Sequence, residues 1–197
     1  MCGIAGFFDP LVSDPLTLRT DCLAMTNVLH HRGPDDGDVW IDGDAGLAFG
    51  HRRLAVLDLT VAGRQPMRSA NERWVIVYNG EIYNHLEIAA DLGASGVRLR
   101  GGSDTEVLLE AIAFWGIEKT IARCNGMFAF AVWDRTQRDL WLVRDRLGEK
   151  PLYYSCAGGR VLFASELKGL HASRGFRASI NRDSLALYLR YGRVPGA

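Results

Sequence analysis

The chain has 197 residues with 23 basic and 23 acidic side chains, so it can build one domain with a sizeable core and carries no formal net charge. It has no long block of like charge, no signal-peptide profile and no apolar stretch long enough for a bilayer, which argues against nucleic acid or a membrane as a partner. Its four cysteines lack CxxC spacing and its histidines have no metal-type arrangement, so we expect a cytoplasmic protein without a disulfide framework or a metal site.

The first part of the chain predicts one helix among several strands. The short apolar run over 3–8 reads as a buried strand that begins almost at the terminus. Apolar side chains then recur at helical spacing and predict a helix over 16–30, which Gly33 and Pro34 end. Further strands are expected over the segments 39–41, 45–49, 54–57 and 74–78.

The second part predicts three helices and two hairpins. A short helix is expected over 84–92. In the next helix Ser103 can cap the N-terminus, Glu106 completes a capping box and Gly116 stops the helix. The remaining expected elements are hairpins over 127–134 with 139–144 and over 153–155 with 161–164, and a helix over 181–191. Strands in the middle with helices beside them favour an α+β sandwich of two packed sheets between helix layers.

Cys2 is a candidate nucleophile because it follows an initiator methionine that can be removed. Without Met1, Cys2 carries both a thiol and a free α-amine, whose ordinary pKa of about 7.7–8.0 suits a general base at neutral pH. A nucleophile and its base on one residue need no separate histidine. With Met1 attached, the nitrogen of Cys2 is an amide and cannot act as a base. On position alone, a small buried cysteine remains the alternative.

Seven sequence blocks along the chain resemble one protein family in the family's order. They are Met1–Gly6, His31–Asp35, His51–Leu54, Asn79–Asn84, Ser103–Glu106, Gly126–Ala131 and Asp145–Tyr153. The chain, from residue 1 to about 194, resembles the class II, N-terminal-nucleophile glutamine amidotransferases, and within them the asparagine synthetase branch. The resemblance implies a four-layer αββα sandwich of two antiparallel sheets, of the Ntn-hydrolase type. It also implies a glutaminase that releases ammonia through a Cys2 thioester.

The resemblance also assigns roles to individual residues. Cys2, Asn79 and Gly80 match the catalytic residues, the last two as the oxyanion hole. Arg53, Glu81 and Asp104 match the residues that hold the glutamine carboxylate and ammonium, and Arg32 is expected to support the cysteine without contacting the substrate. Alternatives remain for each group: Asn79-Gly80 also fits a tight turn, Arg53 and Glu81 fit ordinary surface charges, and Asp104 fits an acid placed at a helix dipole.

The domain organisation and partners follow from the same resemblance. Residues 1–180 are expected to form the amidotransferase domain, and 181–197 the start of a connection to an ATP-dependent synthetase domain absent from this chain. No cofactor is expected in this chain, since ATP and Mg²⁺ would bind to the synthetase domain. The segment over 145–153 is expected to face that domain. Aspartate is the default acceptor of the ammonia, and a sugar or peptide-like acid is the alternative. A homodimer is possible, and a catalytically silent structural or regulatory domain is the alternative function.

Overall fold

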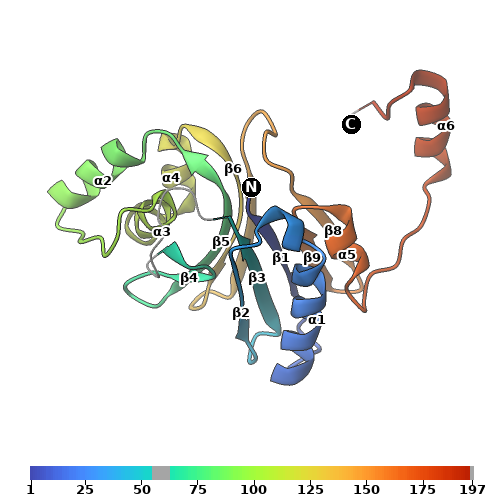
Figure 1. Cartoon of the computed structure of the whole chain (residues 1–197), viewed down its shortest axis with the longest axis horizontal. Helices are drawn as coiled ribbons and strands as arrows, with labels where there is room; N and C mark the ends of the chain where they lie inside the picture. Colours follow the sequence, from blue (N-terminus) through green and yellow to red (C-terminus); the bar gives the residue numbers. More distant parts are fainter. Residues whose placement is uncertain (55–62, 196–197) are drawn as a thin grey trace.

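A computed structural model describes residues 1–54 and 63–195 and contains two antiparallel sheets (Figure 1). The first sheet has the strand order β2-β3-β1-β9-β8. Its strands are β1 (Gly3–Phe8), β2 (Asp36–Asp42), β3 (Leu47–Arg53), β8 (Tyr153–Ala157) and β9 (Arg160–Ala164). The second sheet has the order β4-β5-β6-β7. Its strands are β4 (Met67–Arg68), β5 (Trp74–Ile82), β6 (Gly126–Asp134) and β7 (Asp139–Arg144).

Helices cover the outer face of each sheet (Figure 1). The helices are α1 (Pro15–Asn27), α2 (His85–Ala94), α3 (Asp104–Trp115), α4 (Ile117–Arg123), α5 (Leu167–His171) and α6 (Arg182–Tyr191). Helices α1 and α5 pack on the first sheet, and α2, α3 and α4 lie over the second. None of the helices in the described part of the chain combines the length and apolarity that crossing a membrane requires.

Three apolar clusters separate these four layers. One lies between α1 and the first sheet, and another between the second sheet and helices α2–α4. The third lies between the sheets, where Ile4 and Phe49 from the first sheet meet Val77 and Trp133 from the second. The αββα sandwich of two antiparallel sheets expected from the sequence is therefore confirmed.

Several predicted boundaries differ from the structure. Helix α1 ends at Asn27, and a separate 3₁₀ turn over His30–Arg32 follows it, so the single helix predicted over 16–30 was too long. The strand predicted over 74–78 extends to Ile82. Strand β4 and helices α4 and α5 were not predicted from the sequence because each is short. The predicted strand over 54–57 falls, apart from Leu54, outside the described residues.

The C-terminal helix stands apart from the sandwich (Figure 1). Asn181 caps α6, because its side chain accepts a hydrogen bond from the N–H of Ser184 at 3.0 Å, as predicted. None of the residues of α6 is buried. The domain boundary expected at residue 180 stays a prediction.

Candidate functional site

Strand register brings Cys2 beside Arg53 at one end of the first sheet. Gly3 pairs with Arg52 and Ile4 pairs with His51 between β1 and β3. Continued by one residue, this register sets Cys2 opposite Arg53. Since side chains alternate along a strand and Ile4 faces the second sheet, Cys2 and Arg53 also point toward the second sheet.

Strand β5 supplies the facing wall. Val75 and Val77 lie in the cluster between the sheets, so by alternation Asn79 and Glu81 also point toward the first sheet. Asn79 and its neighbour Gly80 lie inside β5, paired with β6, and the alternative of a tight turn at this dipeptide is wrong. A Cβ on Gly80 would come within 2.5 Å of the Met127 carbonyl oxygen, so only glycine fits against β6 here.

Asp104 reaches the same place from the start of α3. Its Oδ2 atom accepts hydrogen bonds from the Tyr78 hydroxyl at 2.7 Å and from the N–H of Ile82 at 3.0 Å. Tyr78 is buried, and this burial, together with the nearby carboxylate, raises its pKa well above the ordinary value. The two bonds fix the Asp104 carboxylate against β5, so its place in the first helical turn does not exclude a role in a site.

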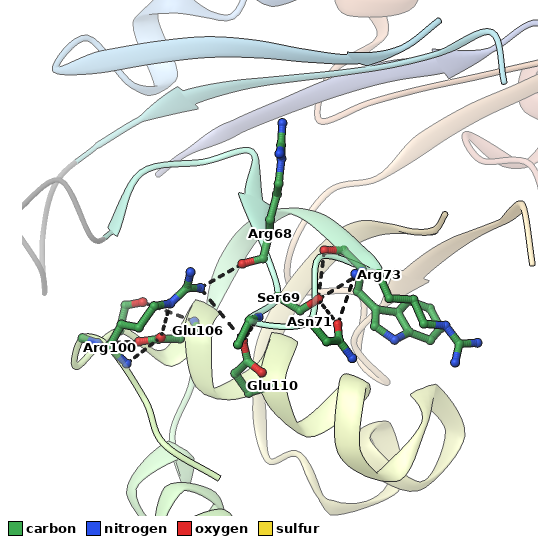
Figure 2. Close-up of polar contacts among 11 residues, drawn as sticks. Arg68, Ser69, Asn71, Arg73, Arg100, Glu106 and Glu110 are labelled. Atoms are coloured by element: carbon green, nitrogen blue, oxygen red, sulfur yellow. Dashed lines mark hydrogen bonds and ion pairs between the residues drawn. The ribbon is translucent and has the colours of Figure 1, made fainter. Parts of the chain in front are cut away.

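A polar network fixes the start of α3 against the β4–β5 hairpin (Figure 2). Ser103 caps the helix as predicted, with its Oγ 3.2 Å from the Glu106 nitrogen. The Glu106 carboxylate does not return to Ser103, so only half of the predicted capping box forms. It accepts the N–H groups of Arg100 and Gly101 at 2.8 and 2.7 Å instead. Glu110 accepts the N–H of Ala70 at 2.7 Å, which ties the helix to the hairpin.

A cavity of about 340 Å³ opens between these elements. Its wall contains all six residues predicted to be catalytic or to bind substrate: Cys2, Arg53, Asn79, Gly80, Glu81 and Asp104. They come from positions between 2 and 104 in the sequence and from three structural layers. Arg53, Asn79 and Asp104 are buried, so the reading of Arg53 as an ordinary surface charge does not hold.

Two residues of β5 that carry hydrogen-bond donors, Asn79 and Gly80, line this cavity. The Nδ2 atom of Asn79 is buried, and no described residue accepts a hydrogen bond from it. The N–H groups of Tyr78 and Ile82 point to the β5 edge that β6 leaves open, where Gln65 and Asp104 accept them. Because backbone N–H groups alternate along a strand, the N–H of Gly80, midway between them, points to the same edge. Donors arranged in this way suit a developing oxyanion.

Arg32 holds the backbone at Cys2, and its side chain does not line the cavity. Its Nε donates to the Cys2 carbonyl at 3.0 Å, and its Nη1 donates to Glu166 at 2.9 Å. Burial raises the pKa of the Cys2 thiol above its ordinary value, although the cations of Arg53 and Arg32 oppose this rise. Burial thus favours the protonated thiol, and a base that removes its proton makes it a nucleophile.

Gln65, Tyr78 and Lys150 also line the cavity, although none of them was assigned to the site from the sequence. Gln65 accepts the N–H of Tyr78 at 2.6 Å, and no local pattern marks it. Tyr78, which orients Asp104, precedes the quoted Asn79–Asn84 block by one residue. Lys150 lies inside the quoted block Asp145–Tyr153, which was expected to face another domain, yet its side chain lines this cavity. The position of this lysine inside the block Asp145–Tyr153 was the signal that could have marked it as a candidate site residue.

The sequence matches a family model described as "Glutamine amidotransferase domain" over residues 1–197. Among curated proteins, the chain is 41% identical over 203 residues to asparagine synthetase [glutamine-hydrolyzing] 3 of Bacillus subtilis, covering 100% of this chain and 32% of that protein. It is 38% identical over 172 residues to asparagine synthetase B [glutamine-hydrolyzing] of Escherichia coli, covering 86% of this chain and 30% of that protein. The chain thus spans about a third of the length of these relatives.

Solved structures share the fold. The chain superposes on a glutamine phosphoribosylpyrophosphate amidotransferase from B. subtilis with a TM-score of 0.69 and 20% identity, covering 87% of this chain and 43% of that one. A structure described as the allosteric regulatory enzyme of purine biosynthesis matches with a TM-score of 0.72 and 21% identity, with the same coverage. At this identity the likeness concerns the fold alone.

Proposed function

Since the chain belongs to the glutamine amidotransferase domain family, we propose that it hydrolyses glutamine to glutamate and ammonia with Cys2 as the nucleophile. The observation that carries the proposal is the convergence on one cavity of Cys2, Arg53, two carboxylates, and Asn79, whose amide nitrogen no described residue uses. Free glutamine presents a carboxylate, an ammonium and a side-chain amide. Each of these groups has a chemically matched partner on the cavity wall.

Substrate binding uses the charged residues of the wall. Arg53 binds the α-carboxylate, for which its planar guanidinium offers two parallel donors. Asp104 and Glu81 bind the α-ammonium. The bonds from Tyr78 and Ile82 already fix Asp104, so little conformational entropy is lost when it binds the substrate.

The reaction is an acyl transfer in two steps. The Cys2 sulfur attacks the amide carbon while the α-amine of Cys2, freed by removal of Met1, accepts the thiol proton. The side-chain amide of Asn79 and the N–H of Gly80 stabilise the oxyanion, and the amine passes its proton to the leaving ammonia. Water then attacks the thioester carbon, the C–S bond breaks, and glutamate leaves with the thiol restored.

The wider role rests on the names of the relatives. We propose that the ammonia serves an ATP-dependent synthetase domain, as in the glutamine-hydrolysing asparagine synthetases, with aspartate as the acceptor and ATP and Mg²⁺ bound by that domain. Four free cysteines, two of them buried, support a reducing cytoplasm as the location. A dimer stays a prediction, and a silent regulatory domain is the competing reading.

A glutamine analogue with a chloroketone in place of the amide tests the proposal directly. We expect it to alkylate Cys2 in protein that lacks Met1, and we expect glutamine to slow this labelling. Peptide mass mapping identifies the modified cysteine, and the exposed Cys156 serves as the internal control. Labelling of Cys156 at the same rate as Cys2, or labelling that glutamine does not slow, would contradict the proposal.

A further inference from the structure

A buried lysine lies in the cavity beside the N-terminal residues. Lys150, on the loop between β7 and β8, is 8% exposed and lines the cavity. Its Nζ atom lies 3.6 Å from the sulfur of Met1, the residue bonded to Cys2. Lys150 therefore lies next to the residue that precedes Cys2, and both Lys150 and Cys2 belong to the wall of this one cavity.

The loop holds the lysine through its backbone. The Asp145 carboxylate accepts the N–H groups of Leu147, Glu149 and Lys150 at 3.2, 2.9 and 3.0 Å. It also accepts the N–H of Phe128 in β6 at 3.1 Å, which anchors the loop to the second sheet. Burial would raise the pKa of Asp145, but these four bonds hold it below its usual value. The Lys150 side chain takes no part in this network, so its replacement leaves the loop anchored.

The ammonium of Lys150 lacks an anionic partner within the part of the chain that the structure describes. No described carboxylate lies within ion-pair distance of its Nζ atom, and a buried charge without a partner is costly. The cavity already contains Arg53 for one carboxylate, and Glu81 and Asp104 for an ammonium. Lys150 is therefore a second cation in this cavity, and glutamine has no second carboxylate to pair with it.

We propose that Lys150 binds the side-chain carboxylate of product glutamate. The inference rests on the proposed function. Hydrolysis of the thioester forms a bond between the acyl carbon and the water oxygen, breaks the C–S bond and leaves a carboxylate next to Cys2. Glutamine presents an uncharged amide at this place. Lys150 thus selects glutamate over glutamine at this end of the cavity and makes glutamate a product inhibitor.

Calorimetric titration of a chain that cannot turn over tests the proposal. The Cys2→Ala variant and the Cys2→Ala/Lys150→Met double variant are prepared, and intact mass shows that both lack Met1. Each protein is titrated separately with L-glutamine and with L-glutamate. We expect Lys150→Met to weaken glutamate binding by at least about tenfold and to change glutamine binding by less than about twofold. Lys150→Arg, which keeps the charge, and Lys119→Met, which removes an exposed lysine of α4, should preserve the parent's preference.

The outcomes separate this proposal from the proposed function. Suppose that glutamine binds and that Lys150→Met changes the affinity for neither ligand, or changes both affinities equally while thermal unfolding is unchanged. The proposed role of Lys150 is then wrong, and the glutaminase assignment stands. If glutamate binds and glutamine does not, the glutaminase assignment fails. The change in glutamate affinity caused by Lys150→Met still decides the role of Lys150. If neither ligand binds, both proposals fail.

Discussion

The role of Asn79 can be tested directly, because its amide nitrogen is buried and no other described residue accepts a hydrogen bond from it. In a packed protein such a donor is costly unless a ligand satisfies it. The proposed oxyanion provides this partner only during the reaction. Asn79 should therefore matter to the rate of the reaction and little to glutamine binding.

We predict that Asn79→Ala lowers kcat for glutamate release by about 10²–10³ and leaves KM nearly unchanged. Steady-state kinetics on protein lacking Met1 measures both constants, with Gln137→Ala in an exposed turn as the control. A rise in KM with an unchanged kcat would place Asn79 in substrate binding instead.

His51 links the two sheets next to the site. Its Nε2 atom lies 3.2 Å from the Tyr78 carbonyl oxygen, to which the neutral ring can donate. Burial, the largest cause, lowers the pKa of His51 from 6.5 to about 4. In the unfolded chain His51 takes up a proton below about pH 6.5, whereas in the folded chain it stays neutral down to about pH 4. The unfolded state therefore binds more protons in this window, and stability falls as the pH falls.

We predict that His51 alone contributes a loss of up to about 1.4 kcal/mol in the free energy of unfolding per pH unit between pH 6.5 and 4. His51→Gln keeps a donor for Tyr78 but does not titrate, so its stability should depend less on pH. Urea unfolding at several pH values measures both slopes, with exposed His30→Gln as the control. Equal slopes for His51→Gln and the parent would refute the prediction.

At the scale of elements, β5 and α3 together position most of the site. Strand β5 supplies Asn79, Gly80 and Glu81, and the bonds of Asp104 fasten the start of α3 to the same strand. The contact between β5 and β6 at Gly80 leaves no room for a side chain. A change at this contact should alter the strand spacing and with it the two proposed oxyanion donors.

We predict that Gly80→Ala lowers kcat at least about a hundredfold, because its Cβ would meet the Met127 carbonyl oxygen and displace the backbone. Gly93→Ala in α2 is the matched control. No neighbouring atom of the described residues would lie within 4 Å of the added Cβ, so this change should leave activity unchanged and slightly raise stability. Full activity in folded Gly80→Ala protein would show that the close strand contact is not needed.

The network of Figure 2 makes a separate prediction for α3. Glu106→Ala removes the acceptor of the Arg100 and Gly101 N–H groups, so the free energy of unfolding should fall by about 2 kcal/mol. KM for glutamine should rise because the start of α3 carries Asp104. Urea unfolding and steady-state kinetics measure these effects, with Glu118→Ala, an acid in the first turn of α4, as the control. An unchanged KM in the destabilised variant would mean that Asp104 does not depend on this network.

Local patterns explain which elements the sequence predicts. The capped helix at 104–115 and the hairpin of β6 and β7 have strong patterns and were predicted within a residue or so. Helix α5 has only five residues and β4 only two, too few for a periodic pattern to emerge. The sequence also could not extend β5 beyond Tyr78, because Asn-Gly is itself a strong turn signal that pairing with β6 overrides.

At the scale of the whole molecule, the site exists because two sheets pack face to face. Cys2 and Arg53 come from the inner face of the first sheet, and Asn79 and Glu81 from the inner face of the second. Motif blocks predicted these four residues together with Gly80 and Asp104. Gln65 and Tyr78 could not be predicted, since their place in the wall depends on tertiary packing that leaves no periodic pattern. Lys150 lies inside a motif block, but only the packing of its loop shows that it belongs to this cavity.

Glutamate release from glutamine by protein shown to lack Met1, compared with Cys2→Ala, tests the central claim most directly. We predict steady release by the parent chain and none by the variant, because only the Cys2 sulfur can form the thioester. Release that persists in Cys2→Ala would show that another group carries the reaction. No release by folded parent chain lacking Met1 would contradict the assignment of this chain as a glutaminase in its own right.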